Sequence, residues 1–169
     1  TPLYSSAASD VYKRQDMATM TWIARSGQPF SEVDEPHFKD FIKFWNPRVT
    51  VKHSTTFSRT KLPLLYDSVM ASIKSQLEKE LPHCNQVALT TDCWTSRAED
   101  PFISLTLHYI NQEFELKKFI LNFDNFVGRH TGYHIGKGMD EMINQHPALA
   151  NVSKKVIVHD AAANMKAGL

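Results

Sequence analysis

Two aspartates, Asp92 and Asp160, follow apolar, β-rich stretches of the sequence and could act as metal ligands. If the two stretches are parallel, neighbouring strands, both carboxylates emerge at the same carboxyl edge of a sheet, where α/β proteins place their sites. Two carboxylates that lie close together repel each other unless a divalent cation lies between them. Carboxylate oxygens suit Mg²⁺ or Mn²⁺, and a pair of such ions can activate water and stabilise a leaving oxygen at phosphorus.

The same two residues also have a purely structural interpretation. An aspartate after a strand is a common helix N-cap, and Asp160 precedes a run, AAAN, that could open a helix. Asp92 could cap or close a turn with Thr95 and Ser96. Spacing alone therefore leaves both the metal site and the caps open.

A second candidate site is the densest basic stretch of the chain, which has Trp45 and Phe57 beside it. The basic residues in it are Arg48, Lys52, His53, Arg59 and Lys61. Such a cluster could contact the phosphates of DNA, and each contact would add to the salt dependence of binding. The alternative is a solvated helix face. The candidate DNA-binding residues are Arg48, Lys52, Arg59 and Lys61.

Three further features carry weaker signals. His130 and His134 are four residues apart, as zinc ligands on one helix face would be, but a cap at Thr131 would leave His130 outside the helix. Cys93 is expected to be a small buried side chain and not a nucleophile. Trp94 is expected to pack in the core and not to contact DNA.

The strands that must position the aspartates are predicted after Asn85, where the chain becomes β-rich. Residues 86–94, 101–110 and 114–123 predict a three-stranded antiparallel meander with a turn at Asn111-Gln112. Residues 154–160 predict a fourth strand. A helix capped by Thr131 and bounded by Pro147 separates the third and fourth strands, with Ile135, Met139, Met142 and Ile143 on one face. This helix can act as the crossover between parallel first and fourth strands.

Residues 17 to about 85 are predicted to be helical. Apolar residues three and four apart predict a helix from Pro36 to Trp45, with Ser31 and Asp34 as possible caps and Asn46-Pro47 as its end. A second, longer helix is predicted from a four-residue repeat of Leu65, Val69, Ile73 and Leu77. Ser58 is its expected cap and Pro82 its expected end.

Composition narrows the classes of protein. Of 169 residues, 42% are apolar and 22% are charged, which indicates a chain with a buried core, and 19 Lys and Arg against 18 Asp and Glu indicate no bulk preference for nucleic acid or membrane. No apolar run approaches the roughly 18 residues of a membrane span, and no hydrophobic signal stretch is visible. Cys84 and Cys93 match neither a disulfide framework nor a C-x-x-C pair, so a reduced, intracellular protein is expected.

The two ends of the chain have unusual features. Residues 1–15, TPLYSSAASDVYKRQ, show no helical or strand period, and ASDVYKRQ resembles a translated sequencing adapter. We expect them to be an assembly artefact, with a genuine disordered leader as the alternative. The last residues only begin a helix, so we expect a fragment at both ends. The remaining organisation is a helical segment at 16–84 and an α/β segment at 85–169.

Several motifs occur in a fixed order along the chain. They are TTDCWTS from Thr90 to Ser96, then SLTLHYI, HTGYHI and finally VIVHDAAANM. This series resembles the hAT superfamily of transposases, which includes the zinc-finger BED-domain-containing proteins derived from them. The stretch QPFSEVDEPHFKDFIKFWNPRVTVKHSTTFSR also resembles the helical DNA-binding and dimerising segment of that family. The resemblance covers nearly everything after residue 16.

The resemblance implies a partial RNase H-like α/β core (β-β-β-α-β) after an all-helical segment. It also implies a split Asp-Asp-Glu metal site in which Asp92 matches the first acid and Asp160 the second. The glutamate would lie beyond a helical insertion, downstream of Leu169. Ala161 stands where the family often has asparagine, and His159 replaces a frequent threonine or serine.

The implied cofactor is Mg²⁺ or Mn²⁺, with Zn²⁺ only in an upstream BED finger outside this chain. The implied partner is DNA, with a homo-oligomer formed through regions partly outside the chain, a nuclear location and no membrane. Two functions stay open. One is a transposase that cleaves DNA and transfers strands, and the other is a domesticated DNA-binding transcription regulator without catalysis. The 169 residues alone are expected to be inactive, because the third acid lies outside them.

Overall fold

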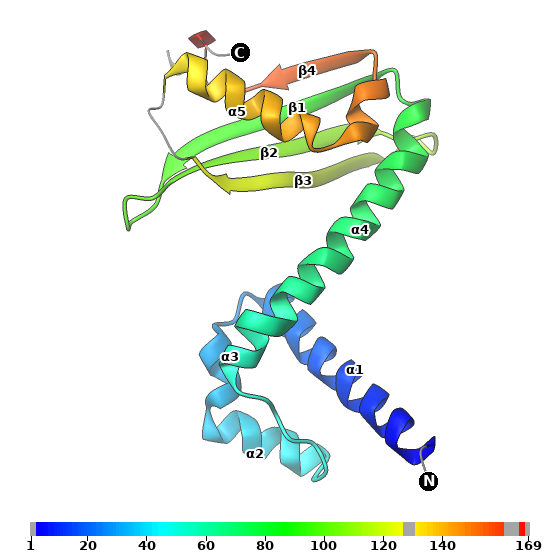
Figure 1. Cartoon of the computed structure of the whole chain (residues 1–169), viewed down its shortest axis with the longest axis vertical. Coiled ribbons are helices and arrows are strands. Elements are labelled where there is room, and N and C mark those ends of the chain that lie inside the picture. Colours follow the sequence, from blue (N-terminus) through cyan, green and yellow to red (C-terminus); the bar gives the residue numbers. More distant parts are fainter. Residues whose placement is uncertain (1–2, 127–130, 161–165, 168–169) are drawn as a thin grey trace. The chain divides into compact units, whose positions relative to one another are not determined.

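The computed structural model describes residues 3–126, 131–160 and 166–167 of the chain (Figure 1). The chain divides into two compact units, Thr1–Ala71 and Ser72–Leu169, and each unit has its own buried apolar core. The second unit starts before the first strand because Leu77 and Leu81, which precede the sheet, belong to its core.

The first unit contains helices and no strand among its described residues. The elements are α1 (Leu3–Ser26), a 3₁₀ turn (Phe30–Asp34), α2 (Pro36–Trp45), α3 (Ser54–Thr56), a π-helical turn (Phe57–Lys61) and the first part of α4 (Leu62–Glu80). Their fully buried apolar side chains are Met20, Ile23, Val33 and Phe57. Because α3, the π-helical turn and α4 follow one another without a break, residues 54–80 form one continuous helical stretch.

Helix α1 begins at Leu3, although no regular structure is predicted before residue 16. Met20 and Ile23, both in its second half, are its side chains in the buried core of the unit. Two core side chains three residues apart set no apolar period over the preceding residues, which is why periodicity does not reveal this helix. The interpretation of residues 1–15 as an artefact concerns their origin and stays a prediction.

The predicted N-caps of both helices, Ser31 or Asp34 for the first and Ser58 for the second, are wrong. Glu35, not Asp34 or Ser31, is the N-cap residue of α2, and its side chain makes no capping bond. The Asp34 carboxylate accepts a hydrogen bond from the backbone N–H of Ser54 at 3.2 Å, 20 residues later in the chain. The long helix therefore starts at Ser54, four residues before the predicted cap at Ser58, since a distant carboxylate satisfies its first N–H group.

The second unit is a mixed four-stranded sheet with a helix, in the predicted order β-β-β-α-β. Its elements are β1 (Gln86–Thr95), β2 (Pro101–Ile110), β3 (Leu116–Asn125), α5 (Gly132–Asn144) and β4 (Lys154–Val158), with short 3₁₀ turns at Leu81–His83 and Pro147–Asn151. The strand order across the sheet is β3-β2-β1-β4. Strand β1 pairs antiparallel with β2 and parallel with β4, which confirms the predicted fold class and the central pair.

The boundaries of β3 and β4 differ from the prediction. Strand β3 starts two residues late because the loop before it is longer than a two-residue turn. In that loop the Asn111 side chain accepts hydrogen bonds from the N–H groups of Glu113 and Glu115, and Phe114 has a φ of 60° and is 91% exposed. Strand β4 ends at Val158, so Asp160 follows the strand by two residues.

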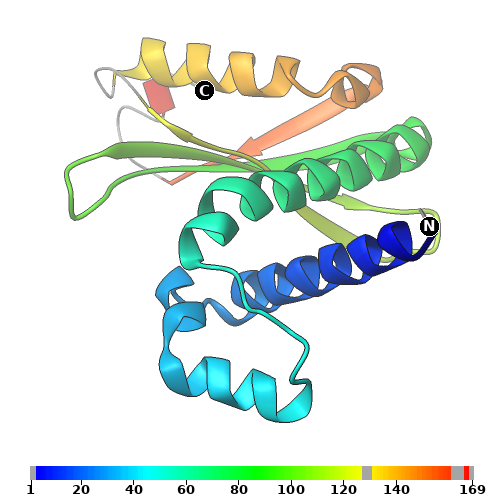
Figure 2. The same cartoon turned by 60° about the horizontal axis from the view of Figure 1, so that its bottom comes forward.

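One face of the sheet packs against α5 (Figure 2). The buried cluster contains Leu89 of β1, Leu105 of β2 and Met139 of α5, and Cys93 packs against it. Because side chains alternate across a strand, Trp94 lies on the opposite face from Cys93. Trp94 there stacks on Phe102 at 5.8 Å between ring centroids, so it is not part of the buried core in which it is predicted.

Candidate functional site

Asp92 lies inside β1, three residues before its end, and its side chain is exposed. It is directly opposite Ser104 of β2 in the antiparallel ladder. The turn that follows β1 is closed by Ser96, whose hydroxyl accepts hydrogen bonds from the N–H groups of Ala98 and Asp100. Asp92 is therefore a surface carboxylate on a regular strand and does not close this turn.

The parallel ladder between β1 and β4 brings Asp92 and Asp160 to the same level. The last pair in that ladder is Thr90 with Val158. Asp92 stands two residues after Thr90, and Asp160 stands two residues after Val158. Because adjacent parallel strands advance together, both carboxylates lie at the same edge of the sheet.

The thiol of Cys93 lies near both carboxylates. Burial raises the pKa of the Cys93 thiol, and the negative charges of Asp92 and Asp160 raise that pKa further. Both carboxylates therefore lie within electrostatic reach of one side chain. The raised pKa keeps the thiol protonated near neutral pH, which suits a packed side chain and not a nucleophile.

The donor set at this edge fits a hard divalent cation. Two exposed carboxylates, one on β1 and one just after β4, offer oxygen ligands and leave the remaining coordination positions to water and substrate, as Mg²⁺ prefers. Within the described ranges, no group of three histidine, cysteine, aspartate or glutamate side chains comes together to hold a metal. The ring of His159 is hydrogen-bonded to the backbone carbonyl of Asp160 at 2.5 Å and is held by the backbone.

The second histidine of the possible zinc pair, His134, lies in the first turn of α5. Its ring nitrogen Nδ1 is 2.7 Å from the hydroxyl of Thr131, so Thr131 occupies the N-cap position but bonds a side chain and no backbone N–H. His130 lies outside the described residues. The zinc pair therefore stays a prediction.

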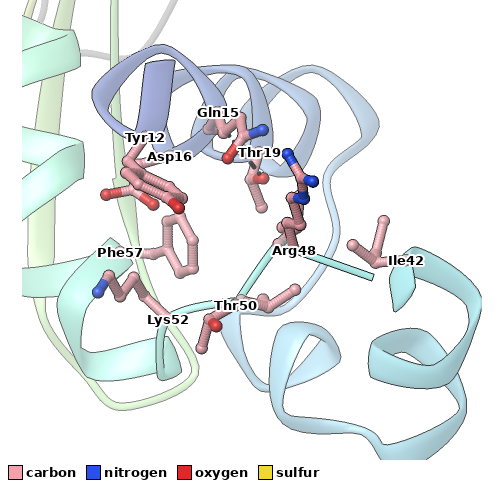
Figure 3. Close-up of a pocket in the computed structure, with 11 residues that line it drawn as sticks. Tyr12, Gln15, Asp16, Thr19, Ile42, Arg48, Thr50, Lys52 and Phe57 are labelled. Carbon is pink, nitrogen blue, oxygen red and sulfur yellow. Dashed lines mark hydrogen bonds between the residues drawn. The ribbon is translucent and has the colours of Figure 1, made fainter. Parts of the chain in front are cut away.

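The basic stretch of the helical unit is divided among different surroundings. Arg48 and Lys52 line a pocket of about 230 Å³ (Figure 3). Arg59 is exposed on the π-helical turn and does not line this pocket. The Lys61 ammonium lies 2.8 Å from the Asp16 carboxylate. The Lys61 side chain is 15% exposed and the Asp16 side chain 16%. The prediction that these four residues contact DNA stays a prediction, but Lys61 already has an anionic partner.

Sequence reasoning missed the other polar side chains of this pocket. Gln15, Asp16 and Thr19 reach it from α1, and Thr50 reaches it from the loop after α2. Asp16 is 45 residues from Lys61 along the chain. No local pattern links positions so far apart, so only the tertiary structure reveals the ion pair.

Comparison with known proteins agrees with this architecture. The family model described as the ZBED1 RNase-like domain matches residues 90–167, which include most of β1 and all of β2, β3, α5 and β4. A putative AC transposase of Zea mays is 26% identical over 140 residues, which are 80% of this chain and 16% of the relative. The human zinc finger BED domain-containing protein 4 is 30% identical over 91 residues, 54% of this chain and 8% of the relative.

The sheet unit matches the ZBED1 RNase-like domain family, and the chain is similar to transposases and to zinc finger BED domain-containing proteins. The putative transcriptional regulator tpeD of Talaromyces stipitatus is also similar, with 26% identity over 145 residues, 86% of this chain. The chain spans no more than 17% of the length of any of these three relatives. Its sheet unit is an RNase-like α/β domain, as the motif order predicts. None of the helices that the structure describes has both the length and the apolar character of a membrane span.

Proposed function

We propose that the sheet unit is the metal-binding part of a DNA-cleaving core, with Asp92 and Asp160 as ligands of Mg²⁺ or Mn²⁺. The observation that carries the proposal is the β1–β4 ladder, whose constant register sets the two carboxylates at one level. The pKa of Cys93, which both carboxylates raise, supports the same proximity. A relative named as a transposase makes DNA the expected substrate.

The two strands give the site its geometry. Asp92 lies on β1, where it pairs with Ser104 of β2, two residues after the last pair between β1 and β4. Asp160 follows the end of β4 by two residues. Both side chains are exposed, so they can meet a substrate phosphate from solvent. The bound ions would supply Lewis-acid activation of water and stabilisation of the leaving oxygen.

Metal binding by the 169-residue chain tests the ligand assignment. Mn²⁺ titration followed by electron paramagnetic resonance should give saturable binding, and Asp92→Asn and Asp160→Asn should each weaken it about tenfold or more, since each removes a charged ligand. Asp140→Asn is the matched control, because Asp140 is an exposed aspartate on α5. Equal affinity in all four proteins would refute the assignment.

Cleavage is tested in a longer protein that carries this chain together with the third acid expected downstream. In Mn²⁺ we expect cleavage of duplex DNA that Asp92→Asn abolishes while DNA binding survives. The 169-residue chain alone should bind metal without cleaving. Absence of cleavage by the longer protein, with the metal site occupied, would reject the catalytic proposal.

A second candidate is a DNA-binding transcription regulator in the nucleus, acting as a homo-oligomer. It is favoured by the similarity to tpeD, a putative transcriptional regulator whose match covers 86% of this chain. In such a protein the sheet unit is a scaffold, and Asp92 and Asp160 are surface carboxylates without a metal. The Mn²⁺ titration separates the two candidates, because a scaffold would bind the ion no better than the Asn variants.

A further inference from the structure

A second hollow of the helical unit lies between α1 and α2 and is almost entirely apolar. Its volume is about 450 Å³, and its lining residues are Ala18, Thr19, Trp22, Phe38, Phe41 and Ile42. We call this hollow the aromatic groove. The polar side chain among the six is Thr19, and its hydroxyl donates to the backbone carbonyl of Gln15 at 3.1 Å. The lining therefore offers apolar contact and no free hydrogen-bond donor.

The aromatic side chains of this groove are unusually exposed. Trp22 of α1 stacks on Phe38 of α2, with 5.3 Å between the ring centroids, and Trp22 is still 38% exposed. Phe41 is 58% exposed. Trp45, one turn further along α2, meets the ring of Phe41 edge-on at 6.3 Å and is 72% exposed, so it extends the apolar surface. Large contiguous apolar patches of this kind mark interaction surfaces.

The two helices that form the aromatic groove are antiparallel. Trp22 of α1 contacts Phe38 of α2. Thr19, three residues earlier on α1, and Ile42, four residues later on α2, both also line the pocket that contains Arg48, whereas Trp22 and Phe38 do not. A trough between two helices accepts the apolar face of a third helix, whose anchoring side chains follow the spacing i, i+3 and i+7.

The aromatic groove has a cation toward each of its ends. Figure 3 shows the Arg48 guanidinium extending toward Gln15 and Thr19 of α1. Arg25 is exposed and follows Trp22 by three residues, so the two lie on the same side of α1. Gln15 and Arg25 are ten residues apart on this helix, a rise of about 15 Å. The two positive charges are therefore separated by the apolar floor.

The lining residues of the aromatic groove include no carboxylate. Within the part of the chain that the structure describes, neither Arg25 nor Arg48 forms an ion pair. Asp40 of α2 is two residues from both Phe38 and Ile42, which places it on the opposite side of that helix. The charge at the ends of the groove is therefore complementary to an acidic ligand.

We infer that the aromatic groove seats an acidic amphipathic helix of a partner protein, with carboxylates beside Arg25 and Arg48 and apolar side chains between them. A second copy of this chain fits less well, because docking through the same face would bring the arginines of the two copies together. A nucleic-acid backbone also fits less well, because the floor has no free donor for phosphate. The inference does not depend on the metal site proposed for the sheet unit.

A fluorescein-labelled helical peptide of about 14 residues tests the inference on the 169-residue chain. The peptide carries leucines at i, i+3 and i+7 and glutamates at both ends, and a matched peptide has lysines in place of the glutamates. Fluorescence anisotropy should show the glutamate peptide binding about tenfold more tightly than the lysine peptide.

One aromatic side chain tests the floor of the groove. Phe41→Ala should weaken binding of the glutamate peptide about tenfold, because the peptide loses a large apolar contact. Phe41 is exposed, so its removal should leave the thermal melt of the chain nearly unchanged. Phe44→Ala is the matched control, since Phe44 is 80% exposed on the same helix and lines no part of the groove. Its affinity should stay within about twofold of the parent value.

An exchange of charge tests the ends of the groove. Arg48→Glu should weaken binding of the glutamate peptide about fivefold at low salt and should strengthen binding of the lysine peptide by a similar factor. A gain of binding cannot result from unfolding, so it separates a lost contact from a lost fold. Lys43→Glu is the control, because Lys43 is exposed on α2 and lines neither hollow. It should change neither affinity by more than about twofold.

Four results would overturn the inference. The first is no binding of the glutamate peptide up to about 1 mM. The second is an equal loss of affinity in Phe41→Ala and Phe44→Ala. The third is a concentration-dependent dimer in sedimentation velocity that Phe41→Ala abolishes, which would assign the groove to a second copy. The fourth is a loss of duplex-DNA binding in Phe41→Ala as large as its loss of peptide binding, which would assign the groove to nucleic acid.

Discussion

The sheet edge and the helical pocket each present two exposed charged side chains, but the chain holds them in different ways. Asp92 and Asp160 take their places from a hydrogen-bonded backbone ladder. Arg48 and Lys52 take theirs from the packing of a loop against α1 and Phe57. A ladder carries a register that can be extrapolated from strand order, whereas loop packing depends on side chains far away in the sequence. The sequence could therefore predict that the two aspartates share a sheet edge. It could not predict which basic residues line the pocket.

The largest expected effect comes from removing one core side chain of each region. Phe57→Ala should lower the free energy of unfolding of the helical unit by about 4 kcal/mol, since Phe57 is 1% exposed and leaves a large cavity. Leu89→Ala should cost the sheet unit about 3 kcal/mol for the same reason. Hydrogen exchange, measured separately for amides of α1 and β1, reports each loss.

Each of these two variants should impair the function of its own unit. Leu89→Ala should also weaken Mn²⁺ binding, because β1 carries Asp92, while Phe57→Ala should weaken DNA binding by disordering the pocket wall. An equal loss of Mn²⁺ affinity in Phe57→Ala and Leu89→Ala would contradict the assignment of the two sites to separate units.

A middle-sized effect is expected at the ion pair behind the pocket. Lys61→Met should destabilise the helical unit by about 2 kcal/mol, because Asp16, which is 16% exposed, is left without its partner. Asp16→Asn in the same chain should recover most of the loss. A thermal-denaturation double-mutant cycle measures the coupling, and a coupling near zero would show that the pair is incidental.

A smaller effect is expected where α1 ends. Gly27 has a φ of 63°, and the N–H of Gln28 next to it donates to the carbonyl of Ile23. Gly27→Ala should cost about 1 kcal/mol, since a side chain disfavours this left-handed conformation while the space around it is open. Chemical denaturation measures this cost, and an unchanged or higher stability would contradict it.

Acidification should affect the sheet unit before the helical unit. Burial lowers the pKa of His146, whose Nε2 is 2.7 Å from the Asn122 amide oxygen. The unfolded chain then binds a proton more readily, so stability falls as the pH drops below about 6.5. Hydrogen bonds from Ser54 lower the pKa of Asp34, so its stabilising effect is present above about 3.9 and is lost as the pH falls through the lower folded pKa.

These two groups give the smallest expected changes, because Asp34 and His146 are both only partly buried. Denaturation of the parent chain at pH 8, 5 and 3 should show the sheet unit weakening between pH 8 and 5 and the helical unit only below pH 4. His146→Gln should flatten the first change, and Asp34→Asn the second. Simultaneous weakening of both units above pH 5 would contradict the assignment.

Much of the sheet unit is predictable from local patterns. Strand β2 runs from Pro101 to Ile110 as predicted, because buried and partly exposed side chains alternate along its length. Helix α5 also follows its apolar period, with Ile135, Met139 and Met142 buried. Strand β3 is displaced because Asn111 organises a loop with its own side chain, which no alternation pattern reports.

The helical unit is less predictable for a physical reason. Its decisive contacts join positions far apart, such as the Asp34 carboxylate with the N–H of Ser54 and Asp16 with Lys61. A local rule assigns Asp34 to the next helix in the chain, because it cannot include a helix that starts 20 residues later. The error at Trp94 is different, because strand alternation, which is a local rule, already puts it on the face opposite Cys93.

By itself, the sequence determined the order of the elements, the family motifs and the two aspartates that follow apolar strand segments. The tertiary structure supplied the parallel register that the pairing of Asp92 with Asp160 had assumed, and it alone decided that Arg48 and Lys52 share a pocket while Lys61 pairs with Asp16. Hydrophobic periodicity is a local property that can be recognised from residues close together in the sequence. Proximity between residues 45 or 68 positions apart arises only when long-range packing and strand pairing close the loops between them.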